Sequence, residues 1–231
     1  YKLPENRIVG IITFLGIYCN VWIEDSSILT KYALLINQRN NTALLIGDAV
    51  IIDNLCKWLD YKFDFVDEEF LILQTLTIKE RGLPIPVKLE NGDIEELVQL
   101  YKENEELMSF RNHSITNLRR YLEEKLSRYL VYGIFKEGRL VSAVFENATC
   151  RKCSMIGGIF TLANFRGQGY STSCVHKICE QILSCGKFGC LFVHKDNLSA
   201  KKVYLRLGFK VHENWKTVKL LLIRYRIAGA K

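Results

Sequence analysis

Short apolar stretches separated by polar turns run through the chain and predict a mixed protein of strands and helices. The clearest succession lies between residues 155 and 209. An apolar strand over 155–161 precedes a glycine-rich loop, and a helix follows whose apolar residues recur every three to four positions. A second strand over 189–193 and a short helix over 198–206 come next. Strand, loop, helix and strand form a βαβ unit, whose crossover is expected to be right-handed.

Further elements are predicted on both sides of this unit. Apolar helical stripes alternate with strands rich in β-branched and aromatic residues before it, and one more apolar stretch follows it. We expect a strand over 84–89, helices over 93–103 and 116–127, a hairpin of strands over 129–135 and 140–148, and a last strand over 217–225.

The first part of the chain has a similar, strand-rich pattern. Asp48 is suited to begin a helix, because an N-cap carboxylate accepts hydrogen bonds from the first N–H groups. Apolar residues from Ile51 to Leu59 then recur at helical spacing. The remaining apolar stretches are predicted to be strands, over 8–14, 17–23, 32–36, 42–46, 63–66 and 70–77.

The best candidate for a domain boundary lies between residues 79 and 86. It combines a charge cluster and a glycine with two of the three prolines of the chain, Pro84 and Pro86. At 231 residues the chain is long enough for two small domains with separate cores. We therefore expect one domain over 1–82 and another over 83–231.

The loop before the central helix has the properties of an anion site. Gly167 and Gly169 lack the Cβ atoms that would keep a bulky anion away from the backbone. The N–H groups of residues 168–171 begin a helix and have no partner within it, so they add to the positive end of the helix dipole. Arg166 adds a permanently charged donor. The loop is suited to hold a pyrophosphate, although such a turn can also serve close packing of helix on strand.

Residues further along make this pattern specific. They lie at the spacing of a second helix that returns to the same end of the sheet: Asn197, Ala200, Tyr204, Gly208 and Phe209. Together with Arg166-Gly167-Gln168-Gly169, they resemble the GNAT acetyltransferase superfamily, whose cofactor signature is Gln/Arg-x-x-Gly-x-Gly/Ala. Ser171 stands at the last small position of that signature. The resemblance covers about residues 83–231 and is strongest over 155–213.

The resemblance implies an α+β fold of the GNAT type, with a mixed, mostly antiparallel sheet flanked by helices and preceded by a smaller α+β domain. It implies acetyl-CoA as acyl donor, no metal, and transfer of the acetyl group to a primary amine. Strand backbone would pair with the pantetheine arm, and the loop would hold the pyrophosphate. The residues implied for cofactor binding are Ile159, Phe160, Thr161, Arg166, Gly167, Gln168, Gly169, Tyr170, Ser171 and Asn197.

The resemblance also implies catalytic roles. Tyr204 would protonate the thiolate that leaves, since a tyrosine of ordinary pKa, about 10, is protonated at neutral pH; alternatively it is a half-buried aromatic of its helix. The general base is open: Glu146, His113 and a water chain are the candidates. Asn197 would bind the pantetheine amide or merely cap the next helix. No cysteine has an evident activating histidine, so we expect direct transfer in a ternary complex.

The succession of strands and a helix in residues 1–82 imitates half of a GNAT domain. It favours a tandem protein whose first copy is degenerate, with an unrelated α+β domain as the alternative. Ile46-Gly47-Asp48 stands where that copy would have its strand-to-helix turn. A carboxylate there would repel a pyrophosphate, so this copy is expected not to bind the cofactor.

Charge is unevenly distributed. The chain has a net charge of +7. Residues 1–82 carry 8 Lys and Arg against 11 Asp and Glu, whereas residues 83–231 carry 24 against 14. The basic part contains the phosphate loop, which suits an anionic nucleotide cofactor. Nucleic acid is the other partner that a basic domain suggests, but the positive residues are dispersed without an arginine-rich run, so we expect none.

The eight cysteines bear on the cellular compartment. Most lie within apolar patterns, where free cysteine behaves as a small hydrophobic residue. Without a visible signal peptide or an apolar run of about 18 residues, we expect a cytoplasmic protein with reduced thiols and no membrane contact. Cys150 and Cys153 form a single CxxC, which favours a turn over metal or redox use, because structural zinc requires four ligands.

A second function remains open beside the enzyme. A GNAT-like protein can bind acetyl-CoA without turnover and act as a sensor or scaffold, and Ser171 together with the missing base supports this. The amine acceptor, the oligomeric state (a homodimer among the alternatives) and any contribution of residues 1–82 to the acceptor site are not encoded in a recognisable pattern.

Overall fold

The computed structural model describes residues 7–39, 42–78, 82, 84–110 and 113–222. The chain forms two compact units. The first unit comprises residues 1–70, 194–196 and 212–231, and the second unit comprises residues 71–193 and 197–211.

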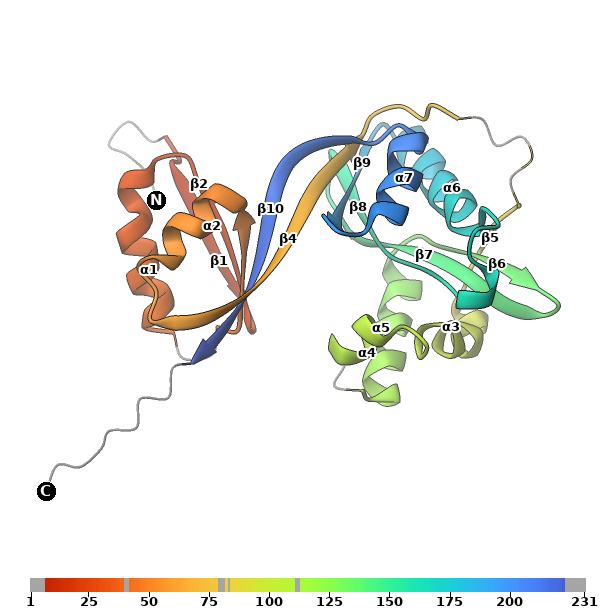
Figure 1. Ribbon diagram of the computed structural model, residues 1–231. Helices are drawn as coiled ribbons and strands as arrows, with labels where there is room; N and C mark the ends of the chain where they lie inside the picture. The colour runs from red at the N-terminus through yellow and green to blue at the C-terminus, as the bar shows by residue number, and fades with distance from the viewer. Residues whose placement is uncertain (1–6, 40–41, 79–81, 83, 111–112, 223–231) are drawn as a thin grey trace, which may run out of the picture. The chain divides into compact units, whose positions relative to one another are not determined.

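The first unit is a sheet with helices (Figure 1). Its strands lie in the order β1-β2-β3-β10-β4, and β2 and β3 are parallel whereas β1 and β2, and β3 and β10, are antiparallel. The elements are β1 (Gly10–Leu15), β2 (Tyr18–Ile23), η1 (Ser26–Ile28), α1 (Leu29–Asn37), β3 (Leu44–Asp48), α2 (Ala49–Cys56), the first part of β4 (Tyr61–Leu73) and the later part of β10 (Lys210–Leu222).

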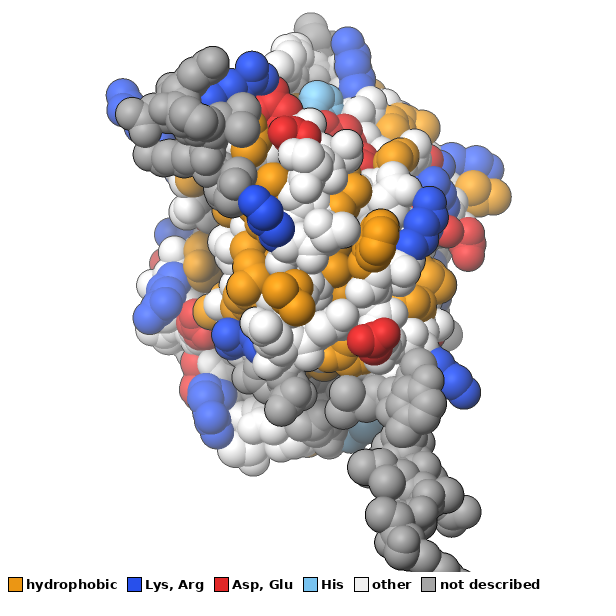
Figure 2. All heavy atoms as spheres, turned by 90° about the vertical axis from the view of Figure 1, so that its left-hand side faces the viewer, with side chains coloured by type: hydrophobic (Ala, Val, Ile, Leu, Met, Phe, Trp, Pro, Cys, Tyr) orange, Lys and Arg blue, Asp and Glu red, His pale blue; other side chains and the backbone are white. Residues whose placement is uncertain are grey.

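A separate core holds this unit together. The fully buried residues of this core come from strands β2, β3 and β10 and from helices α1 and α2: Cys19, Leu45, Val218, Ile36 and Ile52. Figure 2 views the side on which Figure 1 draws α1 and α2, and it shows apolar side chains among charged ones on that surface. The exposed apolar residues of these helices and their ends are Leu34, Leu35, Val50 and Trp58.

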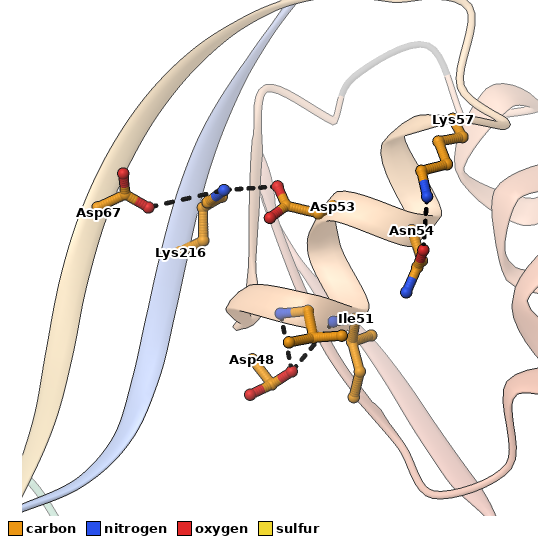
Figure 3. A network of polar contacts seen from close by, with 8 residues as sticks. Asp48, Ile51, Asp53, Asn54, Lys57, Asp67 and Lys216 are labelled. Carbon is orange, nitrogen blue, oxygen red and sulfur yellow. Dashed lines mark hydrogen bonds and ion pairs between the residues drawn. The ribbon is translucent and has the colours of Figure 1, made fainter.

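The first helix corrects one sequence prediction. Residues 32–36 were expected to be a strand but lie in α1. Tyr32, Ala33 and Ile36 are buried while Leu34 and Leu35 are exposed. The burial has the helical period, but the two exposed leucines make the run look uniformly apolar in the sequence. The cap at Asp48 is confirmed, because its carboxylate accepts hydrogen bonds from the N–H groups of Val50 and Ile51, both at 3.0 Å (Figure 3).

A second correction concerns β4. The two strands expected over 63–66 and 70–77 are one strand, β4. The acidic run Asp67-Glu68-Glu69 interrupts the apolar pattern, but its first two residues have partners within the first unit. Lys216 of β10 pairs with Asp67 at 3.6 Å, and the Thr217 hydroxyl donates to Glu68 Oε2 at 2.7 Å.

The second unit has a sheet in the order β4-β9-β8-β7-β6-β5. Figure 1 shows α6 and α7 on one face and α3, α4 and α5 on the other. The elements are β5 (Val87–Lys88), η2 (Asn91–Asp93), α3 (Ile94–Tyr101), α4 (Glu105–Phe110), α5 (Ile115–Arg128), β6 (Val131–Lys136), β7 (Arg139–Thr149), β8 (Cys153–Thr161), η3 (Ala163–Phe165), α6 (Tyr170–Ser184), β9 (Phe188–His194) and α7 (Leu198–Leu207).

The core of the second unit lies on both faces of this sheet. The helix α6 packs against β6, β7 and β8, while α3 and α5 pack against each other and against β7. Phe145, Ile178, Leu118 and Phe209 are among the buried residues. The expected fold, a mixed and mostly antiparallel sheet flanked by helices, is confirmed.

The division into units differs from the expected boundary after residue 82. Strand β4 has its last residues, 71–73, in the second unit, and β10 has residues 212–222 in the first. Both strands are 13 residues long, about 43 Å when extended. β4 contributes buried residues to both cores, whereas the buried residues of β10 belong to the core of the first unit. Residues 79–81, 83 and 223–225, where parts of the boundary and the last strand were predicted, lie outside the described residues.

Candidate functional site

The strands β8 and β9 form the scaffold of the site. They are parallel and pair at Cys153–Met155 with Phe188–Cys190. Beyond these pairs β8 continues to Thr161, and it stays paired there with β7 on its other edge. In the described part of the chain, the later residues of β8 are therefore not paired with β9. Their backbone N–H and C=O groups can pair with an extended ligand as a further strand would.

A bulge in β8 sets the direction of this edge. The register with β7 shifts between the pairs Ala143–Phe160 and Phe145–Gly157. Gly158 lies in the bulge with φ +58°, and a Cβ atom at this position would come within 2.1 Å of the Phe145 ring. Buried Tyr101 of α3 donates its hydroxyl hydrogen bond to the Gly158 carbonyl. Burial raises the pKa of Tyr101 well above its usual value, so this donor keeps its proton.

A cavity of about 890 Å³ opens along this edge. It is bounded by β8, the glycine loop, α7 and the turn between α3 and α4. Except for Gln168 and the two candidate bases Glu146 and His113, all of the residues predicted for cofactor binding and catalysis line it, namely Ile159, Phe160, Thr161, Arg166, Gly167, Gly169, Tyr170, Ser171, Asn197 and Tyr204.

The glycine loop has the backbone that the anion-site prediction requires. Gly169 is the N-cap of α6 with φ +83°, and Gly167 has φ +76°. Both values lie in the left-handed region that other residues rarely adopt. A Cβ atom at either glycine would meet no atom within 4 Å, so the space over the backbone is open. The N–H groups of the first turn of α6 face this space without acceptors in their own helix.

Two side chains brace the loop. Arg166 Nε donates to the Thr161 carbonyl at 3.1 Å, which leaves the other guanidinium N–H groups available. Gln168 Oε1 accepts from the Tyr170 hydroxyl at 3.1 Å. The side chain of Gln168 is thus engaged within the loop and does not line the cavity, although the resemblance implied a cofactor contact for this residue.

Tyr204 and Asn197 border the cavity from α7. Tyr204 has only 6% of its surface exposed. Burial raises the pKa of Tyr204 above its usual value, and Cys179 raises it further. Asn197 Oδ1 accepts from Ala200 N at 3.1 Å and Ser199 Oγ at 3.0 Å, so the capping role considered for Asn197 is present. Its amide N–H groups are donors that the cap does not use.

Glu146 does not lie in this cavity. It pairs with Ile156, five residues before Thr161, which is about 16 Å along β8. Its buried side chain lines a different cavity of about 430 Å³ together with Gln181 and Ile182, near the opposite end of α6. Leu130 N donates to it at 3.4 Å. The structure does not bring Glu146 to Tyr204, so its interpretation as general base is corrected. His113 is exposed and lines neither cavity.

The turn between α3 and α4 supplies residues that sequence reasoning missed. Glu103, Asn104 and Glu105 line the first cavity. Glu103 accepts a hydrogen bond from Arg139 at 2.7 Å, and Asn104 Oδ1 caps α4 by accepting from Leu107 N at 3.0 Å. No pattern in the sequence marks these three residues as part of a site. The cavity thus has carboxylates on one side, and Arg166, Arg206 and the α6 N-terminus on another.

Comparison with known proteins identifies this architecture. The model of the FR47-like protein family matches residues 131–219, which contain β8, the loop and α7. A GNAT-family acetyltransferase from Colwellia psychrerythraea has a TM-score of 0.66 at 14% identity and covers 94% of this chain and 83% of its own. This is a GNAT fold. The prediction of that superfamily is confirmed at the level of fold.

Two further GNAT structures match most of the chain. A GCN5-related N-acetyltransferase from Sphaerobacter thermophilus has a TM-score of 0.68 at 13% identity, covering 95% of this chain and 79% of its own. A tandem GNAT protein from the clavulanic acid biosynthesis pathway has a TM-score of 0.56 at 12% identity, covering 93% and 80%. Among curated proteins no significant match was found.

Two further properties of the described residues bear on other functions. Within the described ranges, no three His, Cys, Asp or Glu side chains are grouped so that they could hold a metal ion. In those ranges no helix is both long and apolar enough to span a bilayer.

Proposed function

We propose that this protein is an N-acetyltransferase that moves the acetyl group of acetyl-CoA to a primary amine by direct transfer in a ternary complex. The observation that best supports this proposal is the cavity of about 890 Å³. It brings together the edge of β8 beyond its pairs with β9, the open N-terminus of α6 and the buried Tyr204. GNAT folds use acetyl-CoA, and each of these three features suits one part of that molecule.

The donor is held along β8 and the loop. The pantetheine arm has amide groups, which pair with the backbone of residues 159–161 as an added strand would. The pyrophosphate lies over Gly167 and Gly169, where first-turn N–H groups and Arg166 donate to it. The free amide donors of Asn197 are placed for the carbonyl of the arm.

The reaction must remove one proton from the amine and add one proton to the sulfur of the leaving CoA. A neutral amine attacks the thioester carbonyl, and a backbone N–H of the bulged strand stabilises the tetrahedral oxyanion. Its collapse releases the CoA thiolate, which Tyr204 protonates. A raised tyrosine pKa keeps this acid in its protonated form until the thiolate appears.

The acidic side of the cavity suits the amine. Glu103 and Glu105 attract an ammonium ion, and Glu105, directly or through water, is a candidate to remove its proton. Cysteines are absent from the lining, and burial raises the pKa of Cys174 to about 12. Both observations support direct transfer over an acetyl-cysteine intermediate.

The test combines binding with turnover. Calorimetry should detect one acetyl-CoA per chain, and Arg166→Ala should weaken it about tenfold through loss of charged hydrogen bonds. Arg128→Ala removes an exposed arginine outside the cavity and serves as the control. Absence of binding by the unmodified protein would refute the proposal.

Turnover is measured as thiol release with a panel of primary amines. Tyr204→Phe should lower kcat about 100-fold while acetyl-CoA affinity is kept, because the hydroxyl acts only on the leaving thiolate. The second candidate function, a silent acetyl-CoA sensor or scaffold, is favoured by the position of Glu146 outside the cavity. Stoichiometric acetyl-CoA binding without thiol release for any amine would select it.

We also propose that the first unit is a degenerate GNAT-like half without a cofactor site. The supporting observation is Asp48, whose carboxylate already occupies the N-terminus of α2. The match to a tandem GNAT protein over most of the chain is consistent with this. A stoichiometry of two acetyl-CoA molecules per chain would refute it.

A further inference from the structure

The turn between β7 and β8 brings two thiols into contact. Cys150 and Cys153 flank the two-residue turn of Arg151 and Lys152, and Cys150 N donates to the Cys153 carbonyl at 2.8 Å. Their Sγ atoms are 3.4 Å apart. Directly beneath them Thr149 pairs with Ser154 and Ala148 with Met155. The two sulfurs are therefore held together by backbone pairing.

This placement is compatible with a disulfide. Residues joined by hydrogen bonds across antiparallel strands have Cα atoms about 5.5 Å apart, which lies within the range of about 4.4–6.8 Å that disulfides require. Bond formation needs the two sulfurs to approach by about 1.4 Å, to the usual S–S length of about 2.05 Å. Side-chain rotation at an exposed turn can supply such a movement.

The two thiols differ in environment. Cys150 is exposed, and hydrogen bonds from the backbone N–H groups of Lys152 and Cys153 lower its pKa, with Lys187 contributing. Cys153 is half-buried, and burial together with Cys150 raises its pKa. A thiolate is the nucleophile in thiol–disulfide exchange, so Cys150 is suited to react first and Cys153 to resolve the product.

A third thiol lies close by, but we do not expect it to take part in the disulfide exchange. Cys190 of β9 is buried, and its Sγ donates to the Ser154 carbonyl at 3.6 Å. Burial raises the pKa of Cys190 to about 12, so it remains a thiol at neutral pH. Metal binding by the three is not supported, because the described residues contain no group of three suitable ligands that could hold an ion.

We propose that Cys150 and Cys153 form a reversible redox pair that small-molecule disulfides, with glutathione disulfide as the probe, oxidise to an intramolecular disulfide. The Cys150 thiolate attacks one sulfur of glutathione disulfide, forming a mixed disulfide and releasing one glutathione thiolate. The Cys153 thiol loses its proton and attacks Cys150 Sγ, which releases the second glutathione. Two protein thiols are oxidised and one glutathione disulfide is reduced to two glutathione molecules.

The test equilibrates the full chain with glutathione buffers, traps free thiols by alkylation, and maps the peptides by mass spectrometry. In the oxidising buffer the peptide containing Cys150 and Cys153 should lose both alkylation sites and weigh two hydrogen atoms less than its reduced form. Dithiothreitol should restore both thiols. Cys185, the other exposed cysteine, is the internal control, and it should remain either alkylated or singly glutathionylated.

Variants separate the two steps. Cys153→Ser should trap one glutathione on Cys150, whereas Cys150→Ser should leave Cys153 reduced, and Cys185→Ser should not alter disulfide formation. Alkylation at pH 7 should modify Cys150 before Cys153. The proposal is overturned if both thiols of the unmodified chain remain reduced in the oxidising buffer, if glutathione stays on Cys150 without resolution, or if Cys153→Ser acquires no glutathione at Cys150.

Discussion

Two helices of this protein begin directly after a strand or after the loop that follows a strand, and the caps at their N-termini are of opposite kinds. In α2 the carboxylate of Asp48 accepts from two backbone N–H groups of the first turn. In α6 the N-cap is Gly169, which has no side chain and leaves the first turn facing a cavity. The same helix geometry is therefore closed by the protein's own anion in one unit and left for an external anion in the other.

The largest expected effect comes from a negative charge at the N-terminus of α6, where α2 has the carboxylate of Asp48. Ser171→Asp places a carboxylate in the first turn of α6 beside the open loop. We expect acetyl-CoA affinity measured by calorimetry to fall about 100-fold, since ~3 kcal/mol of repulsion is reasonable for charges a few ångströms apart near a surface.

The fold should tolerate this change. An acidic residue in a first helical turn stabilises a helix by about 0.3–1 kcal/mol, so the Tm of Ser171→Asp should be unchanged or slightly higher. Ser171→Asn has the same shape without the charge and should bind acetyl-CoA nearly as the unmodified chain does. Equal losses in the Asp and Asn variants would show that size, not charge, determines the effect.

A smaller effect is expected from Gly169→Ala. Its φ of +83° costs a residue with a side chain about 1 kcal/mol, or about 2–4 °C in Tm. The new methyl group enters the cavity, and we expect acetyl-CoA affinity to fall about tenfold. Gly186→Ala is the matched control, because Gly186 has φ +71° and equally open surroundings but lies outside the cavity. It should lose stability without losing affinity.

Removing the carboxylate of Asp48 should lower the stability of the fold without changing acetyl-CoA affinity. Asp48→Ala leaves two first-turn N–H groups of α2 without their acceptor and should lower the free energy of unfolding by about 1 kcal/mol, measured with denaturant. Asp48→Asn retains a cap oxygen and should recover most of it. Acetyl-CoA affinity should be unchanged in both variants. A change in affinity would contradict the assignment of the cofactor to α6 alone.

The smallest effect concerns the second polar contact of α2. Lys216 bridges Asp53 of α2 and Asp67 of β4 (Figure 3). Lys216→Met should cost about 0.5 kcal/mol at low salt, less at high salt, and more than the same change at exposed Lys219.

The pH dependence of this contact has a defined sign. Burial works against the charge of Lys216, but Asp53 and Asp67 outweigh it and raise its pKa. A cation with a raised pKa stabilises the folded state below its unfolded pKa of about 10.5, and this contribution is lost as the pH rises further. Denaturant titrations at pH 8 and above pH 10.5 should therefore bring Lys216→Met closer to the unmodified chain at the higher pH. A difference that persists above the raised pKa of Lys216 would exclude this charge effect.

The α6 site could be predicted from the sequence because its determinants are local. Arg166, the two glycines and the start of α6 lie within six residues. Their effect depends on the local backbone conformation, which nearby residues determine. Asp48 was recognised as a cap for the same reason. By contrast, the position of Glu146 depends on the register of β7 with β8, which no residue near Glu146 reveals.

The missed features depend on distant partners. The hydrogen bond from Tyr101 to the Gly158 carbonyl joins α3 to the bulge of β8, and no residue near Tyr101 in the sequence indicates it. The acidic run of β4 looked like an interruption until its partners on β10 were seen, 149 positions away for Glu68 and Thr217. Glu103 and Glu105 look like ordinary surface carboxylates in the sequence, and only the fold brings them to the cavity.

The strand order of the first unit has a consequence for synthesis. Residues 212–222 of β10 lie between β3 and β4, which are both made more than a hundred residues earlier. At about 5–20 residues per second, a ribosome takes roughly 7–30 seconds to travel from β4 to β10. During that interval β3 and β4 lack the strand that separates them. The first unit, most of which is translated before the second, therefore lacks β10 until last, whereas the strands and helices around the cavity of the second unit have by then been made.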